Sequence, residues 1–209
     1  MRRIIKKQTL LIMGIALVLG STGCSLSPQI INLDSSSPSL EANKPSSGIT
    51  GIVSKKPERS ALVRVRDLRE QTDRLGYRGG SNPKQAPLFT EPTLQVALTQ
   101  KMQESLTQLG FGGEGMADPV KVDVAVNTLN YNCNEGSWVN QCELVIAFTL
   151  TILNKESTFS QPFSLNQRRS VVAAPRVGYN EEWINEAINE LWSHMMSHPN
   201  VKEALGTRN

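Results

Sequence analysis

Alternating apolar and polar residues predict several strands in the second half of the chain. Residues 120–126 place a valine at every other position, and residues 144–152 repeat this alternation with leucine, isoleucine and phenylalanine. A weaker run over 159–165 contains Pro162, which predicts an edge strand because proline cannot donate to a ladder. Each of these strands is expected to have one buried and one exposed face.

An earlier strand is predicted over residues 61–67. Val63 and Val65 share one face of it and Arg64 and Arg66 occupy the other, while Leu62 breaks the strict alternation. A polar, glycine-rich loop is expected from residue 70 to residue 87.

Two segments space their apolar residues as amphipathic helices do. The first covers 90–109, with Thr90 as its cap and Pro92 in its first turn, and Gly110 ends it. The second opens at Asn180, which two glutamates follow, and Pro199 ends or kinks it. A short helical turn over 199–205 fits the sequence beyond Pro199.

The predicted order of elements is therefore β-α-β-β-β-α. We expect an α+β fold in which an antiparallel sheet of about four strands carries two helices on one face, because three consecutive strands favour a meander. Residues 61–209 suffice for one domain around a single core.

The first residues have the pattern of a lipoprotein signal peptide. Residues 1–8 carry four basic side chains, and an apolar run over 9–19 follows that is shorter than the roughly 20 residues of a spanning helix. Thr22 and Gly23 before Cys24 resemble the bacterial lipobox, although Ser21 replaces the usual leucine. We expect residues 1–23 to be removed and Cys24 to carry diacylglycerol and palmitate-type chains. Ordinary signal-peptidase cleavage after Gly23 is the alternative.

Residues 24–60 are predicted to form a flexible tether. They are rich in serine, proline and asparagine, so they bury little apolar surface. Two apolar islands, 30–33 and 49–53, form either short edge strands or loosely held contacts. Ser25 stands where an aspartate retains enterobacterial lipoproteins in the inner membrane, which favours the outer membrane and a domain facing the periplasm.

The charge of the mature chain gives no argument for nucleic acid as a partner. The full sequence has a net charge of +3, but removing the four basic residues of the signal leaves 18 basic against 19 acidic residues.

Cys133 and Cys142 flank a loop between two predicted strands. An oxidising periplasm favours a disulfide between them, since Cys24 accounts for the odd third cysteine. Trp138 lies in the loop, either as an exposed contact for a partner or folded back on the sheet.

Basic residues gather between residues 64 and 84. Arg64, Arg66 and Arg69 are candidate contacts for an acidic partner or a phosphate, and the alternative is a solvated face paired with the interleaved acids. His194 and His198 have helical i, i+4 spacing, which suits either surface histidines or a soft-metal site. We expect no metal and no cofactor.

The chain resembles the YajG-like family of bacterial lipoproteins. The resemblance rests on the lipobox at Cys24, the segments 65–73 and 106–111, and the valine strand that begins at Val120. It implies an envelope location and this order of elements, and it supplies no catalytic residues.

The sequence contains no hydrolase elbow or P-loop, and we interpret the protein as non-enzymatic. We expect a membrane-anchored binding or assembly module that contacts an envelope protein. The alternative function is a carrier that holds a lipid or glycan between the helices and the sheet.

Overall fold

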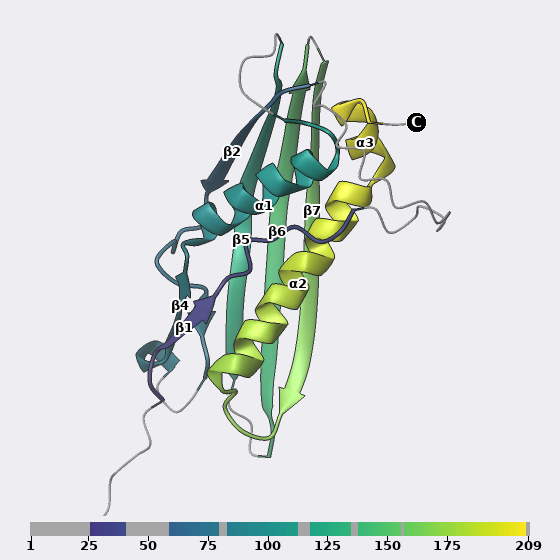
Figure 1. Cartoon of the computed structure of the whole chain (residues 1–209). Helices are drawn as coiled ribbons and strands as arrows, with labels where there is room; N and C mark the ends of the chain where they lie inside the picture. The colour runs from purple at the N-terminus through teal and green to yellow at the C-terminus, as the bar shows by residue number, and fades with distance from the viewer. Residues whose placement is uncertain are drawn as a thin grey trace, which may run out of the picture.

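The computed structural model describes residues 26–40, 59–79, 83–112, 118–134, 138–155 and 157–207. In these ranges three α-helices cover one face of a mixed seven-stranded sheet (Figure 1). The strands run in the order β1-β4-β3-β5-β6-β7, and β2 pairs with β5. None of the described helices is both long and apolar enough to cross a bilayer. The elements are β1 (Gln29–Asn32), β2 (Ala61–Asp67), β3 (Gly76–Tyr77), a 3-10 turn (Pro83–Gln85), β4 (Pro87–Glu91), α1 (Leu94–Gln108), β5 (Val120–Asn134), β6 (Asn140–Asn154), β7 (Ser157–Val171), α2 (Val177–Ser197) and α3 (Pro199–Leu205).

The prediction of a four-stranded antiparallel sheet is wrong. Strand β2 lies parallel to β5, because β3, β4 and α1 intervene along the chain and carry it back to the same end of the sheet. Strand β1 is parallel to β4, and β3 joins β4 to β5. Strands β1, β3 and β4 have five residues or fewer, so they are too short to display a clear period.

The meander of β5, β6 and β7 supplies the longest strands of the sheet, and each has 15 residues. Every second residue of β6 from Cys142 to Ile152 is buried beneath the helices. In β5 the register shifts between Val126 and Thr128, and this bulge keeps the apolar residues on the core face although the alternation moves by one position. Strand β7, which contains Pro162, ends the sheet as predicted.

The N-cap of helix α1 lies three residues later than predicted. Thr90 belongs to β4, Pro92 follows a cis peptide bond, and Thr93 is the residue that caps the helix. The Thr93 hydroxyl accepts a hydrogen bond from the Val96 N–H at 3.4 Å. Thr90 pairs with Ile31 of β1, so the helix can begin only after β4 ends at Glu91.

Helix α2 begins at Val177, so Asn180 is not its cap. The Asn180 side chain is fully buried, where it accepts a hydrogen bond from the Tyr131 hydroxyl (2.6 Å) and donates one to Gln29 Oε1 (2.7 Å). Burial raises the pKa of Tyr131, so the phenol stays protonated as this donor. Three elements, β1, β5 and α2, are joined by this network.

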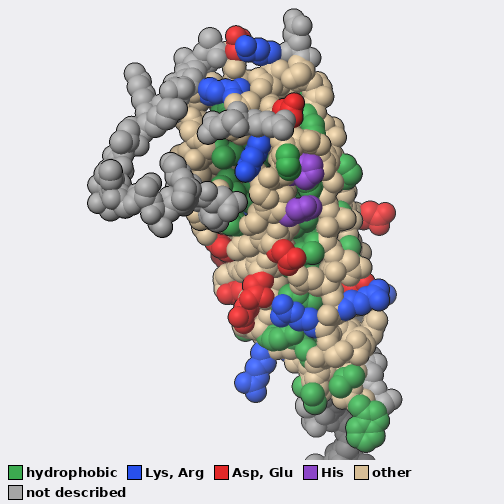
Figure 2. Space-filling view, turned by 90° about the vertical axis from the view of Figure 1, so that its right-hand side faces the viewer, with side chains coloured by type: hydrophobic (Ala, Val, Ile, Leu, Met, Phe, Trp, Pro, Cys, Tyr) green, Lys and Arg blue, Asp and Glu red, His purple; other side chains and the backbone are tan. Residues whose placement is uncertain are grey.

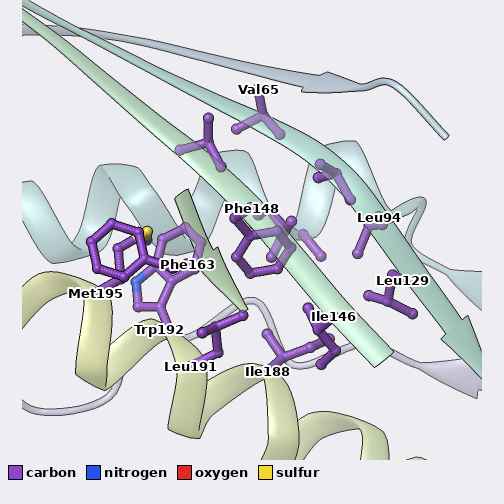
Figure 3. Close-up of a cluster of buried hydrophobic side chains, with 14 of the residues drawn as sticks. Val65, Leu94, Leu129, Ile146, Phe148, Phe163, Ile188, Leu191, Trp192 and Met195 are labelled. Atoms are coloured by element: carbon purple, nitrogen blue, oxygen red, sulfur yellow. The ribbon is translucent and has the colours of Figure 1, made fainter. Parts of the chain in front are cut away.

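Large side chains fill the layer between the helices and the sheet (Figure 3). Phe148 of β6 and Trp192 of α2 meet edge to face with ring centroids 6.2 Å apart, and both are fully buried. The Trp192 indole N–H donates to Ser105 Oγ of α1 at 2.9 Å. A carrier of lipid or glycan would need an open apolar cavity in this layer, which these side chains occupy.

Residues 26–40, assigned above to the tether, pack on the domain where the structure describes them. Ile31 of β1 is 0% exposed, and Leu33 is also buried. Beyond β1 the backbone N–H of Asp34 donates to Asn185 of α2 at 2.9 Å, and that of Leu40 donates to Gln108 of α1 at 3.0 Å. The first apolar island therefore forms an edge strand, and the second, 49–53, lies outside the described residues.

Lys101 of α1 holds this segment between the two long helices. Its side chain is buried, and its ammonium donates to the Ser36 carbonyl and to Asn189 Oδ1 of α2 (2.8 Å). Burial lowers the pKa of Lys101, and the nearby carboxylate of Asp34 opposes this effect. The sequence did not reveal this role, because a lysine on an amphipathic helix is ordinarily exposed.

Cys133 and Cys142 form the predicted disulfide. The two residues face one another in the β5–β6 register, and both side chains lie on the buried face of the sheet. The bond closes the end of the hairpin that carries Trp138.

The packing of β1 predicts that two neighbouring isoleucines contribute very differently to stability. Replacing the buried Ile31 by alanine should lower the free energy of unfolding by about 2–5 kcal/mol. The control Ile30→Ala removes a side chain that is 55% exposed, and should change stability by less than about 0.5 kcal/mol. Denaturant unfolding of the mature chain measures both. Equally small effects would show that residues 26–40 are not part of the folded domain.

The disulfide predicts a second loss of stability. Replacing Cys133 and Cys142 together by serine opens a ten-residue loop, which should cost about 2.7 kcal/mol in the chain-entropy model. The midpoint of urea unfolding reports the change. A reductant should lower the stability of the natural chain by the same amount and leave the double variant unchanged. If the reductant did not change the unfolding midpoint of the natural chain, the disulfide would be contradicted.

Candidate functional site

The outer edge of β2 carries main-chain groups that face away from the sheet. The Ser60 carbonyl accepts from the Val120 N–H (3.0 Å), and the Leu68 N–H donates to the Val126 carbonyl (2.9 Å). The N–H and C=O groups of successive residues point to opposite sides of a strand. The main-chain groups of the even-numbered residues from 60 to 68 therefore face β5. The odd-numbered residues of β2 therefore direct their N–H and C=O groups outward, and among the described strands β2 pairs with β5 alone.

A pocket of about 380 Å³ lies along this edge. One wall is the start of β2, and the other is the C-terminal half of α1 with the residues that follow it. We call this feature the β2 groove, and its lining residues are Ala61, Leu62, Val63, Gln103, Leu106, Thr107, Phe111 and Gly112.

Backbone pairing closes one end of the β2 groove. Phe111 forms an isolated parallel bridge with Arg59, and the Gly112 N–H donates to the Arg59 carbonyl at 2.9 Å. The Arg59 guanidinium lies 5.0 Å from the centroid of the Phe111 ring and donates to the Leu205 carbonyl of α3. The groove is thus a strand edge beside a helix, with apolar side chains at its base.

Two of the predicted contact residues, Arg64 and Arg66, project from β2 on the sheet face opposite the helices. Asp123 of β5 lies between them, with Arg66 at 2.7 Å and Arg64 at 3.9 Å. Hydrogen bonds to Asp123 raise the pKa of Arg66. The side chain of Arg64 is 73% exposed, so Arg64 is the more available of the two.

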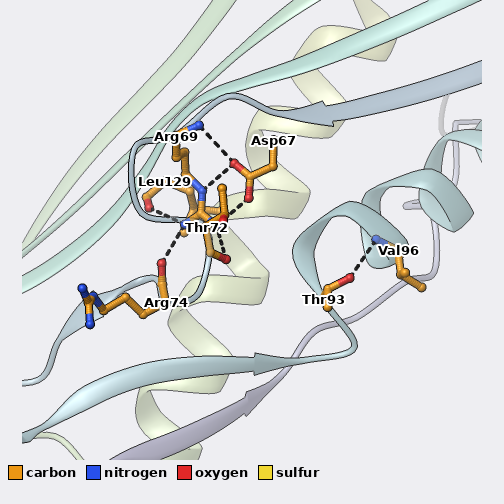
Figure 4. Close-up of polar contacts among 7 residues, drawn as sticks. All are labelled: Asp67, Arg69, Thr72, Arg74, Thr93, Val96 and Leu129. Carbon is orange, nitrogen blue, oxygen red and sulfur yellow. Dashed lines mark hydrogen bonds and ion pairs between the residues drawn. The ribbon is translucent and has the colours of Figure 1, made fainter.

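The third predicted arginine, Arg69, has a structural role (Figure 4). Only 6% of its side chain is exposed, and it forms an ion pair with Asp67 at 2.7 Å. It also donates to the carbonyls of Arg74 (2.9 Å) and Leu129 (3.2 Å), which fixes the loop after β2 against β5. Sequence proximity to Arg64 and Arg66 therefore does not place Arg69 in the same surface.

Trp138 lies at the opposite end of the sheet from the β2 groove. Its side chain is 89% exposed, so the indole does not fold back onto the sheet. The β2 groove adjoins the beginning of β5 at Val120, whereas Trp138 follows the end of β5 at Asn134. The predicted contacts thus fall into separate regions of the molecule.

His194 and His198 pack around Phe163 of β7, with ring centroids 5.9 and 5.7 Å from it. His198 Nδ1 accepts the Asn200 N–H at the start of α3 (3.3 Å), which gives it a capping role. In the described part of the chain no group of three or more metal-ligating side chains gathers. Cys24 lies outside the described residues.

The sequence missed the β2 groove, although one signal pointed to it. Leu62 interrupts the alternation of β2 on its polar face, and it is 55% exposed. Leu153 of β6 is a second exposed leucine, and its partner in the register, Lys121, also pairs with Leu62. The two leucines therefore flank Lys121 on the sheet face opposite the helices.

Three solved structures that align with this chain share little sequence with it. An uncharacterized protein is 10% identical, with a TM-score of 0.47 over 86% of this chain and 99% of that one. A Xanthomonas campestris protein is 9% identical, with a TM-score of 0.44 over 84% and 95%. A minor lipoprotein from Acinetobacter baumannii is 16% identical, with a TM-score of 0.36 over 50% and 80%.

No curated protein matches the chain. A family described as uncharacterized lipoprotein matches residues 54–206, which include β2, the β2 groove and every later element. This match agrees with the resemblance seen in the sequence, and the chain belongs to this family of uncharacterized lipoproteins.

Proposed function

We propose that the protein is an outer-membrane lipoprotein that faces the periplasm and binds an extended segment of an envelope protein in the β2 groove. The observation that carries this proposal is the outward-facing edge of β2 beside a pocket with apolar side chains at its base and polar ones on its helix wall. In this role the protein assists assembly by binding, without catalysis.

Strand addition explains how such a groove recognises its partner. Main-chain hydrogen bonds to an added strand supply affinity, and pockets for alternate side chains supply specificity. The outward groups of Ala61 and Val63 would pair with the added strand, while the base of the groove at Leu106 and Phe111 accepts an apolar side chain. Arg64, exposed on the same strand, suits an acidic residue next to that segment.

Anchoring through acyl chains on Cys24 completes the proposal. Membership of a lipoprotein family and the lipobox-like residues before Cys24 both support acylation. Several acyl chains hold a protein on a membrane firmly, since each buried methylene contributes about 0.8 kcal/mol. Intact-mass measurement of the natively expressed protein should find an acylated residue 24, and a free thiol there would remove the anchor from the proposal.

The first test of the β2 groove is site-specific photocrosslinking in living cells. A photoreactive residue at position 62 should capture an envelope protein in a defined adduct. The control is position 96 of α1, because Val96 is 45% exposed, comparable to Leu62, and does not line the groove. The same adducts from both positions would argue against a specific site.

The second test asks whether the partner pairs as a strand. Val63→Pro removes an outward N–H, whereas Val63→Ala removes a similar part of the side chain and keeps that N–H. We expect the position-62 adduct to persist in Val63→Ala and to be lost in Val63→Pro. Thermal unfolding of both variants checks that they fold. An adduct of equal yield in both would contradict strand addition.

A further inference from the structure

Exposed apolar side chains gather at the end of the sheet opposite the β2 groove. We call this surface the hairpin end, and it consists of Trp138 (89% exposed), Val139 (38%), Val172 (86%) and Val177 (44%). The β6–β7 register pairs Asn140 with Val171, so the loop with Trp138 and the connection with Val172 lie at the same end of neighbouring strands. Figure 2 shows hydrophobic side chains at the lower end of the molecule.

The described chain begins beside this surface. The Arg78 guanidinium donates to the carbonyl of Ser27 (3.4 Å) and to that of Pro175 (2.8 Å), and Gln29 Nε2 also donates to the Pro175 carbonyl (3.3 Å). Pro175 belongs to the connection between β7 and α2 that carries Val172. In Figure 1 the chain enters β1 at the lower end, where the β5–β6 hairpin and the start of α2 also lie.

Covalent geometry then limits where an acyl anchor can be. Cys24 precedes Ser27 by three residues, and a chain spans at most about 3.6 Å per residue. The α-carbon of residue 24 therefore lies within about 11 Å of that of Ser27. Because residues 26–40 pack on the domain, no long leash separates the anchor from the hairpin end.

Arg176 supplies an exposed positive charge near the hairpin end, next to Pro175, which suits a lipid phosphate. Arg78 instead directs its donors at the main-chain carbonyls of Ser27 and Pro175. No carboxylate of the described residues forms an ion pair with either guanidinium. Arginine beside tryptophan is a typical composition for a surface at the boundary between water and lipid, where the indole prefers to lie.

We propose that the hairpin end rests on the membrane that holds Cys24, with Trp138 and Val172 at the lipid interface. This inference rests on the acylation of Cys24 in the proposed function, and it concerns a surface distinct from the β2 groove. The strands of the β5–β6–β7 meander then project about 50 Å from the membrane, since a strand rises about 3.3 Å per residue over 15 residues. The β2 groove, beside the beginning of β5, is carried to the membrane-distal end.

Tryptophan fluorescence tests the orientation in the acylated protein. Trp183 and Trp192 are 0% exposed, whereas Trp138 is 89% exposed, so lipid can reach only Trp138 among the three. The protein is reconstituted in vesicles of phosphatidylethanolamine and phosphatidylglycerol that contain phosphatidylcholine brominated on its acyl chains. We expect bromine to quench the Trp138 emission, and the quenched part of the signal to be absent in Trp138→Phe.

A second reporter at the far end of β6 is the matched control. Leu153 is 40% exposed, and Leu153→Trp in the Trp138→Phe background places an indole at the opposite end of the strand that follows Trp138. We expect no quenching at this position. Quenching at neither position would overturn the proposed orientation. Equal quenching at both positions would also overturn it, because the domain would then lie flat on the membrane.

Flotation and intact mass separate this inference from the proposed function. If the acylated protein floats with the vesicles while Trp138 remains unquenched, the anchor stands and the orientation is wrong. If the chain carries no acyl group and does not float, the proposed anchor is wrong, and the orientation falls with it.

Discussion

The burial of one face of the β5–β6–β7 meander is the interaction on which the rest of the structure depends. Strands β5 and β6 present a continuous apolar surface to which β7 adds the buried Phe163, and α1 and α2 are held in place because they cover this surface. The bulge in β5 preserves this surface over the whole length of the strand. The opposite face stays polar, so the core is one layer between sheet and helices.

Buried polar groups then fasten the N-terminal segment to that core. Asn180 and Lys101 bond to groups of β1 and of the segment after it, and each would be costly to bury without these partners. The result is that the first described residues are fixed at one end of the sheet. A lipid anchor on Cys24 would therefore act close to the folded domain.

The molecule consequently has two different ends. The hairpin end combines exposed apolar side chains with the entry of the chain, whereas the β2 groove lies at the other end beside exposed leucines. The two proposals assign the hairpin end to the membrane and the groove to a protein partner. Because the long strands separate the hairpin end from the β2 groove, the protein could contact the membrane and its partner at the same time.

The sequence by itself determined the elements whose apolar residues keep one spacing over many positions, which are the meander and the two long helices. It also determined the disulfide between Cys133 and Cys142. Those features follow from local alternation and spacing. Only the tertiary structure decided the parallel pairing of β2 with β5, the short strands β1, β3 and β4, and the separation of Arg69 from Arg64. The reason is physical: short strands and buried polar side chains are stabilised by partners distant in the chain, and local patterns do not encode those partners.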